Sequence, residues 1–372
     1  MIDILLLTRQ GFNNPKVWSG TPLALLNAFK KDKRVKITSE DMELPAGLRG
    51  IYYRILCSMF FMMYHCHDML LRPIFYAILW RIYKNNKSKD FSLQMNDFYI
   101  PDFLRKKGRN AIYVDAHRPE WWKYLLPNDK RLFRGVYMED FNRATKKSLE
   151  NADLIFTMNE WTKKGFVKDF SIQESKIVNV HFGVNLQPYY GVKDYSRKLM
   201  LIVLREGTEE YKGLNLLLKA MPFIMGKIPD AELAVVGSKV GEGVDGVKCY
   251  YNQSREVTVR LFKESTLYTM PALAEPNGIT YLEALANKTP IVGLDRFALP
   301  EFSGYGEWGF ICKKESPEEL ANVIIDAFSD EERLMEMGQL GQKFVVENFD
   351  WGKVEENMVR CMSNLITNNK LK

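Results

Sequence analysis

The stretch EPNGITYLEALANKTPIVG, residues 275–293, carries the most information about this chain. Two carboxylates, Glu275 and Glu283, lie eight positions apart, and Gly278 falls between them just before an apolar helical run. Glycine lets the backbone approach a ligand closely, and the N–H groups and positive dipole end of a helix start favour an anion such as phosphate. One turn could therefore present a carboxylate to a sugar, N–H groups to a diphosphate and a second carboxylate to a ribose. The alternative is a helix with a polar start and Glu283 on its solvated face.

The same spacing resembles the E-x7-E signature of the retaining glycosyltransferases of family 4, which have the two-domain GT-B fold. The run LEALANKTPIV at 282–292 is similar to the tail of that family's motif, with Lys288 where glycine is usual. The resemblance implies that Glu275 holds the donor sugar and that Glu283 holds the ribose. It also implies nucleotide contacts from the helix start, at Asn277, Gly278, Ile279 and Thr280.

Length and composition are typical of a soluble globular protein with two domains of ordinary size, since 46% of the 372 residues are hydrophobic and 26% are charged. The net charge of +6 is unevenly divided: residues 1–196 carry 31 Lys and Arg against 20 Asp and Glu (+11), and residues 197–372 carry 21 against 26 (−5). A basic N-terminal half favours anionic substrates or surfaces, although solubility alone would also explain it. Since no nucleic-acid motif accompanies the charge, no nucleic-acid partner is expected.

Cysteine usage and the first residues indicate the compartment. The five cysteines are scattered without metal-binding spacing, which favours reduced thiols in the cytoplasm over a disulfide framework. The run MIDILLLT at 1–8 is too short for a signal peptide and lacks a basic flank. It predicts a buried first strand, and we expect a cytoplasmic protein.

Short apolar runs alternate with longer amphipathic stretches, and this βαβ rhythm predicts an α/β fold with parallel, helix-covered sheets. With the resemblance, it implies two Rossmann-like, doubly wound domains that face each other across a cleft. The expected strands are 3–8, 34–39, 111–115, 132–137, 153–157, 177–181, 199–204, 232–237, 246–250, 266–270, 290–294 and 308–312. The predicted domains are an acceptor-binding domain at 1–195, a nucleotide-sugar-binding domain at 196–350 and a helix at 351–372 that crosses back to the first domain.

Residues 51–90 interrupt this rhythm with a sequence rich in aromatic residues and methionine. Charged residues break it into pieces shorter than the ~20 apolar residues of a membrane-spanning helix. Two alternatives stay open: a buried helical hairpin, or an amphipathic pair that faces an anionic membrane surface or a lipid-linked acceptor. The run HCHD at 65–68 has residue types that bind metals, but alternate residues face apart on a helix, so no metal is expected.

Arg205 and Lys212 follow the first expected strand of the C-terminal half, in the loop REGTEEYKG at 205–213. A strand, a basic loop with glycine and then a helix suit a phosphate, because a departing diphosphate needs fixed positive charge. Two exposed surface charges are the alternative. In family 4 an arginine after this strand and the lysine of a Lys-Gly pair bind the donor diphosphate, and Arg205 and Lys212 match those positions.

The N-terminal half contains two further expected sites. Gly20 and Thr21 follow the first strand and open a helix, where glycine again permits close approach of a phosphate. A plain helix cap by Ser19 is the alternative. His117 follows another expected strand, and its similarity to family members with a histidine there implies that it points into the cleft and contacts the acceptor. A structural role for His117 is the alternative.

The resemblance implies a retaining glycosyltransferase that moves a sugar from a UDP- or GDP-sugar to a hydroxyl acceptor. The acceptor would be a glycan or lipid-linked glycan in cell-surface polysaccharide or glycoconjugate assembly, reached at the inner face of the membrane. No metal or other cofactor is expected, and the expected catalytic residues are Arg205, Lys212, Glu275 and His117. The alternatives are a GT-B phosphorylase or hydrolysing epimerase, and a catalytically silent module that binds nucleotide sugars.

Overall fold

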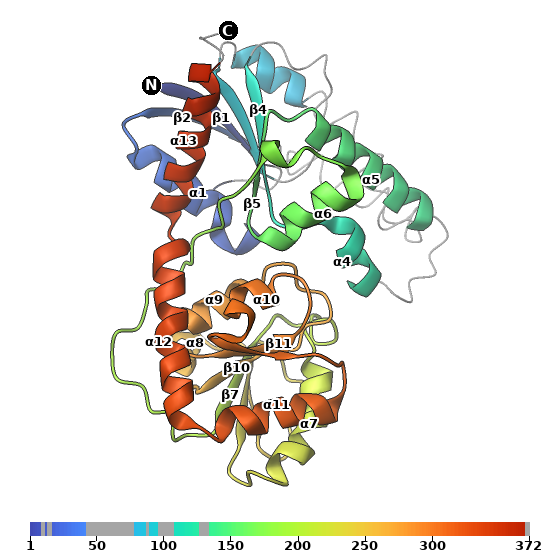
Figure 1. Cartoon of the computed structure of the whole chain (residues 1–372), viewed down its shortest axis with the longest axis vertical. Helices are drawn as coiled ribbons and strands as arrows, with labels where there is room; N and C mark the ends of the chain where they lie inside the picture. The colour runs from blue at the N-terminus through green and yellow to red at the C-terminus, as the bar shows by residue number, and fades with distance from the viewer. Residues whose placement is uncertain are drawn as a thin grey trace. The chain divides into compact units, whose positions relative to one another are not determined.

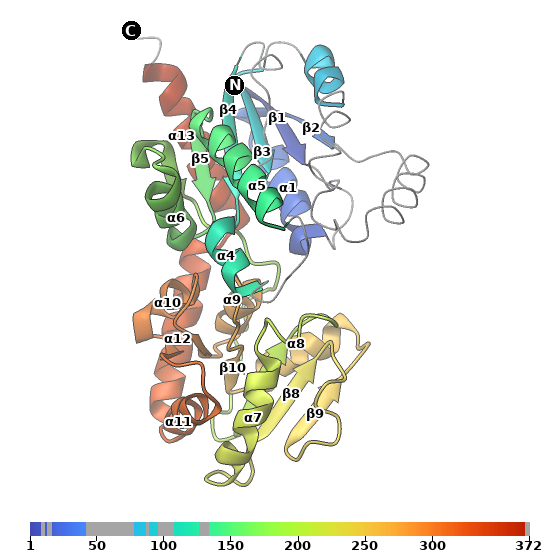
Figure 2. The ribbon, with the colours of Figure 1, turned by 90° about the vertical axis from the view of Figure 1, so that its right-hand side faces the viewer.

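The structure is a computed structural model that describes residues 1–8, 12, 17–41, 78–86, 89–95, 108–125 and 134–368. The chain divides into two compact units, and each is described by itself (Figures 1 and 2). The first unit comprises Met1–Met158, Thr162–Gly183 and Trp351–Lys372. The second comprises Asn159–Trp161 and Val184–Asp350.

The first unit is built on a six-stranded parallel sheet of order β2-β1-β3-β4-β5-β6. Its strands are β1 (Ile2–Thr8), β2 (Val35–Asp41), β3 (Phe91–Met95), β4 (Arg109–Val114), β5 (Leu154–Thr157) and β6 (Ile177–Asn179). Its described helices include α1 (Thr21–Lys31), α4 (Arg118–Leu125), α5 (Arg134–Glu150), α13 (Trp351–Asn368) and, from Thr162 on, α6 (Glu160–Phe170). Helices α5 and α6 pack over β4 and β5, and α13 packs against α1 (Figure 1).

One sequence prediction in this unit is wrong, and one strand was not predicted. Residues 134–137 of the strand expected at 132–137 are instead the start of α5, because a short apolar run cannot distinguish a strand from a turn of helix. Strand β3 was missed, yet it lies between β1 and β4 at the centre of the sheet. Its polar residue Gln94 masked the strand signal, although the side chain is fully buried and donates to Ser148 Oγ at 3.2 Å.

The aromatic-rich segment at 51–90 lies largely outside the described residues. Residues 78–85 form a helix, and Leu79 and Ile82 pack on Leu5 and Leu7 of β1. The opposite side of this helix carries Trp80, which is 51% exposed. Within the described ranges, no helix is long and apolar enough to cross a membrane.

The second unit has a six-stranded parallel sheet of order β12-β11-β10-β7-β8-β9. Its strands are β7 (Leu199–Val203), β8 (Glu232–Val236), β9 (Val247–Tyr250), β10 (Leu267–Thr269), β11 (Ile291–Leu294) and β12 (Gly309–Cys312), so all six sequence predictions here are confirmed to within one residue at each end. Its main helices are α7 (Leu214–Met225), α8 (Arg255–Glu264), α9 (Ile279–Ala286), α10 (Leu299–Phe302), α11 (Pro317–Phe328) and α12 (Glu331–Asn348). Helix α7 packs against α11, and α9 packs against α12.

The strand order of the second unit reverses between β7 and β10, which are neighbours at the centre of the sheet. In doubly wound sheets, ligands bind at such a switch point, outside the carboxyl ends of the strands. Here that edge carries the loop from β7 to α7 and the loop from β10 to α9. These loops contain the residues that the sequence singled out.

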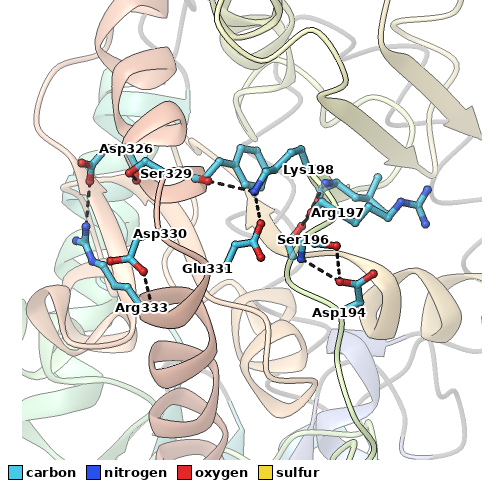
Figure 3. A network of polar contacts seen from close by, with 12 residues as sticks. Asp194, Ser196, Arg197, Lys198, Asp326, Ser329, Asp330, Glu331 and Arg333 are labelled. Carbon is cyan, nitrogen blue, oxygen red and sulfur yellow. Dashed lines mark hydrogen bonds and ion pairs between the residues drawn. The ribbon is translucent and has the colours of Figure 1, made fainter.

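A polar network joins the amino end of β7 to the junction of α11 and α12 (Figure 3). Lys198, the residue before β7, donates to the carbonyl oxygen of Phe328 at 3.2 Å and to Glu331 Oε1 at 3.1 Å. Asp330 caps α12 by accepting from the N–H of Arg333 at 2.9 Å. Because this network lies at the amino ends of the strands, it is at the opposite edge of the sheet from the switch point.

Candidate functional site

The candidate site begins where β7 ends, at Leu204 and Arg205. The N–H of Arg205 donates to Thr208 Oγ1 at 3.2 Å, and its carbonyl oxygen accepts from the same hydroxyl at 2.6 Å. This local turn fixes the backbone while the Arg205 side chain stays exposed. Among the described residues, the guanidinium has no hydrogen bond or ion pair within range, so its five donors are available to an anion.

The start of α7 is held against the loop that follows β10. Gly213 caps α7 with a left-handed φ of 79°, and a Cβ at this position would collide with the carbonyl oxygen of Pro271. Only glycine combines this conformation with so close an approach. The preceding residue, Lys212, is thereby brought to the β10–α9 loop.

Lys212 and Glu275 form an ion pair across the switch point. Lys212 Nζ lies 3.0 Å from Glu275 Oε2, and the two side chains are only 15% and 18% exposed. Glu275 Oε1 also accepts from the N–H of Gly278 at 3.0 Å. Burial by itself raises the pKa of Glu275, but the Lys212 charge and the hydrogen bonds outweigh it, so the pKa lies below its usual value. Glu275 is therefore an ionised carboxylate with fixed orientation.

Helix α9 starts at the same place. Gly278 caps it with a φ of 65°, and a Cβ there would collide with the ring of Tyr281. Thr280 accepts a hydrogen bond from the hydroxyl of Tyr268 at 2.6 Å, and the hydroxyl of Tyr281 donates to the carbonyl oxygen of Met270. These bonds tie the first turn of α9 to the end of β10 and leave Asn277, Ile279 and Thr280 half-buried at the helix start.

Glu283, one turn further along α9, has a different environment from Glu275. Burial raises its pKa to about 7, and the charges of Arg255 and Lys212 only partly offset this effect. A carboxyl group with such a pKa is shared between its protonated and ionised forms at neutral pH. It can accept hydrogen bonds from ligand hydroxyls more strongly once it is ionised.

Two residues of this region were missed by sequence reasoning. Tyr268 is a fully buried strand residue, and its sequence context is that of an ordinary core aromatic. Arg255 begins α8, donates to the carbonyl oxygen of Asn185 at 3.0 Å and lowers the pKa of Glu283. The only available signal was a basic residue just after the turn residues that follow β9.

Gly20 and Thr21 lie in the first unit, at the start of α1. Gly20 has a left-handed φ of 83° and caps the helix without a side-chain hydrogen bond. Trp18 and Ser19 also have positive φ values, 47° and 55°. The indole N–H of Trp18 donates to Asp115 Oδ2 at 2.8 Å, so the start of α1 is tied to the residue that follows β4.

The structure contradicts the expected placement of His117. Its side chain is completely buried, and its Nε2 lies 3.1 Å from Asp169 Oδ2 on α6. The ring packs against Phe166 and Phe170, and Gly165 leaves the space for it, since a Cβ there would overlap the imidazole. Burial lowers the pKa of His117 to about 4, although Asp169 raises it. His117 therefore has the structural role that was the alternative.

No group of three or more His, Cys, Asp or Glu side chains gathers as a metal site in the described part of the chain. The run at 65–68, which has metal-binding residue types, lies outside the described residues.

Comparisons with known proteins address the segment that holds the switch-point loops. Residues 193–344 match the family model of "Glycosyl transferases group 1". This group 1 segment contains Arg205, Lys212, Glu275 and Glu283 and all six strands of the second sheet.

Two curated relatives extend the similarity along the chain. "Spore coat protein SA" of Bacillus subtilis is 26% identical over 297 residues, covering 68% of this chain and 78% of the relative. The "GDP-mannose-dependent monoacylated alpha-(1-6)-phosphatidylinositol monomannoside mannosyltransferase" of Corynebacterium glutamicum is 25% identical over 287 residues, covering 70% of this chain and 72% of the relative.

Solved structures show the same fold at low sequence identity. Sucrose-phosphate synthase from Thermosynechococcus elongatus matches with a TM-score of 0.71 and 14% identity, covering 99% of this chain and all of the neighbour. The chain has two six-stranded parallel sheets covered by helices, and it matches this solved structure along almost its whole length. The fold is therefore GT-B, which confirms the predicted fold class.

Proposed function

We propose that this protein is a retaining glycosyltransferase that uses a nucleoside-diphosphate sugar. One observation carries the proposal: the exposed Arg205, a Lys212–Glu275 ion pair and a glycine-capped helix start meet at the switch point of the group 1 segment. Positive charge, the start of a helix and a fixed carboxylate at one edge suit a diphosphate with a sugar attached. The E-x7-E spacing supports assignment to family 4.

The residues at the switch point have separate roles in this proposal. Arg205 and Lys212 hold the diphosphate and neutralise the charge that develops as it leaves. The helix start at 277–280 offers the N–H groups of Ile279 and Thr280 to a phosphate, and Glu283 accepts from the ribose hydroxyls. Glu275, oriented by Lys212 and Gly278, accepts from hydroxyls of the donor sugar. The barrier is lowered by positioning and electrostatics.

The reaction needs no side-chain nucleophile. The bond between the anomeric carbon and the β-phosphate oxygen breaks, and the acceptor oxygen bonds to that carbon on the same face. The acceptor proton passes to an oxygen of the departing diphosphate, so atoms and charge balance. Retention of configuration follows from departure and attack on one face.

The donor is a UDP- or GDP-sugar, and the acceptor is a glycan or lipid-linked glycan. The name of the Corynebacterium relative supports a GDP-sugar. We further propose that the basic N-terminal half reaches such an acceptor at the cytoplasmic face of an anionic membrane. Trp80 supports this location, because it is exposed on the helix at 78–85 and Lys84 Nζ lies 5.0 Å from its ring centroid. A Trp with a flanking Lys suits a membrane interface.

A panel of UDP-, GDP- and ADP-sugars tests the proposal. The true donor should raise the melting temperature, because a ligand that binds only the folded state stabilises it by mass action. With a hydroxyl acceptor, free nucleoside diphosphate should then appear together with a product of retained configuration. Release without an acceptor would instead indicate a hydrolase, and turnover that needs inorganic phosphate would indicate a phosphorylase. Tight binding with no release would indicate a silent binding module.

A further inference from the structure

The C-terminal end of α9, like its start at the switch point, is held by hydrogen bonds to other parts of the unit. The last carbonyl groups of a helix lack intrahelical partners and need other donors. The carbonyl oxygen of Ala286 accepts from the N–H of Tyr189 at 3.0 Å and from Gln342 Nε2 at 2.7 Å. The carbonyl oxygen of Lys288 accepts from the hydroxyl of Tyr195 at 2.7 Å. Donors from residues 189–195 and from Gln342 of α12, all remote from α9 in sequence, thus cap this end.

Lys193 is the central residue of this cap. It is 8% exposed, and its Nζ donates to the carbonyl oxygens of Asn287 at 3.0 Å and Phe262 at 2.9 Å and to Thr289 Oγ1 at 2.5 Å. An ammonium group has three N–H donors, so this arrangement uses all of them. All three acceptors are neutral, and burial of an ammonium without a carboxylate is costly.

Burial of the Lys193 ammonium therefore costs more free energy than burial of an apolar side chain in the same space would. Burial, followed by the nearby charge of Lys288, lowers the pKa of Lys193 to about 7. An apolar side chain of similar length would fill the same space without that cost. Such an apolar side chain would not fix the position of the Asn287 carbonyl oxygen relative to the end of α8 at Phe262.

The capped end connects directly to the candidate site. The side-chain amide of Asn287 donates to the carbonyl oxygen of Glu283 at 2.8 Å, while the backbone carbonyl of the same residue accepts from Lys193. Helix α9 has only 8 residues. At 1.5 Å per residue it is roughly 12 Å long, so a displacement of its end moves the start as well.

We propose that Lys193 is a positioning residue for nucleoside-diphosphate binding, because its three hydrogen bonds set the position of α9 and hence of Gly278 and Glu283. The inference rests on the proposed function. It assigns to the segment that precedes the second sheet a role in ligand affinity. Lys193 itself touches no substrate in this scheme.

The test compares Lys193→Met with Lys198→Met. Lys198 is a matched control, since it also caps the end of a helix of the same unit, at Phe328 of α11, but at the opposite edge of the sheet (Figure 3). Calorimetry with GDP and with UDP measures affinity, and thermal melting measures stability. Lys193→Met should lower the affinity for the nucleoside diphosphate by at least ~10-fold, because a small displacement of binding groups has effects of this scale. Lys198→Met should lower the melting temperature with unchanged affinity.

Two outcomes would overturn the inference: wild-type affinity in Lys193→Met, or equal losses of affinity in both variants. If Lys193→Met does not fold, Thr289→Val provides a milder variant, because it removes one acceptor of Lys193 at nearly constant volume. It should also lower the affinity for the nucleoside diphosphate.

Hydrogen exchange without nucleotide separates this inference from the proposed function. Exchange of the α9 amides near Gly278 should be faster in Lys193→Met than in Lys198→Met, and equal protection would overturn the positioning role. If the wild-type chain bound neither nucleotide, the proposed function would be wrong, whereas the exchange result would still decide whether Lys193 positions α9.

Discussion

Arg205 and Lys212 occupy different environments, although both are proposed to bind the diphosphate. The Arg205 side chain is exposed, whereas Lys212 is largely buried against Glu275. From the sequence alone we would expect both to be solvated in an empty site. If the proposal is right, a bound diphosphate must share Lys212 with Glu275, because the ion pair places the carboxylate proposed to bind the sugar next to the ammonium proposed to bind the phosphate.

We predict that Arg205→Ala and Lys212→Ala each lower turnover by more than ~100-fold, the scale of removing one preorganised charge stabiliser. Their stabilities should differ. Arg205→Ala should melt like the wild type, while Lys212→Ala should melt lower because it leaves the Glu275 carboxylate part-buried and unpaired. Lys219→Ala is the control, since Lys219 is an exposed residue of α7. Near-normal turnover in either site variant would rule out this placement of the diphosphate.

The two glutamates should respond differently to substitution and to pH. If Glu283 holds the ribose as a carboxylate, nucleoside-diphosphate affinity should rise as pH rises through about 7, where its raised pKa lies. Below that pH a proton must be released on binding, and affinity should fall by up to ~10-fold per pH unit.

Calorimetry at pH 6 and pH 8 measures this dependence. Glu283→Gln should bind nucleoside diphosphate more weakly at pH 8 and lose the part of the pH dependence that comes from Glu283. The pH dependence of affinity that remains would come from the phosphate and from Lys193. Glu275→Gln should keep most of the nucleoside-diphosphate affinity and the full slope while transfer is impaired. An equal loss of affinity in both variants would contradict the division of roles.

At the scale of elements, the site depends on two helix starts that are capped by left-handed glycines. Gly213 and Gly278 each occupy a position where a Cβ would strike a neighbouring group. Local sequence indicated both helices through their apolar periodic runs, and glycine is among the residues accepted at an N-cap. The collision with Pro271, which makes glycine indispensable at position 213, depends on a loop distant in sequence.

We predict that Gly213→Ala destabilises the protein more than Gly207→Ala. Gly207 has a similar φ of 83°, but no atom lies within 4 Å of the Cβ position. Its substitution should therefore cost only the left-handed strain, roughly 1–2 kcal/mol, or about 2–8 °C in melting temperature for a unit of this size. Gly213→Ala adds a backbone collision. Similar melting temperatures for the two variants would show that α7 can shift freely from the β10–α9 loop.

At the scale of the whole molecule, the distribution of charge and aromatic residues bears on location. We predict that the chain floats with anionic vesicles but not with neutral ones. Each basic residue near an anionic surface contributes about 1 kcal/mol, and high salt should reverse binding because the Debye length is already only ~8 Å at physiological ionic strength. Arg81→Glu with Lys84→Glu, both exposed on the helix at 78–85, should weaken flotation.

The matched control for flotation replaces two exposed lysines of the second unit, Lys219 and Lys313, by Glu. This variant has the same change in net charge, so equal weakening would indicate a general charge effect and not a defined surface. Absence of flotation with either lipid would favour the internal hairpin over the membrane-facing pair for residues 51–83.

Much of the second unit could be predicted from sequence, because its information is local. All six strands are short apolar runs, and their bounds agree with the structure to within one residue. The spacing of Glu275, Gly278 and Glu283 places them on one helix start without any knowledge of the sheet. In the first unit the same reasoning failed at α5 and at β3, where a short apolar run and a buried glutamine gave the wrong local pattern.

What the sequence by itself determined was which elements form and which chemical groups lie at their ends. Only the tertiary structure decided which groups meet, because pairing across the sheet depends on strand order and not on local pattern. The order β10-β7 brings Lys212 to Glu275, packing of α6 buries His117, and the return of residues 189–195 places Lys193 beneath α9. Burial then set the pKa of each group, since the cost of removing a charge from water depends on neighbours that are distant in the chain.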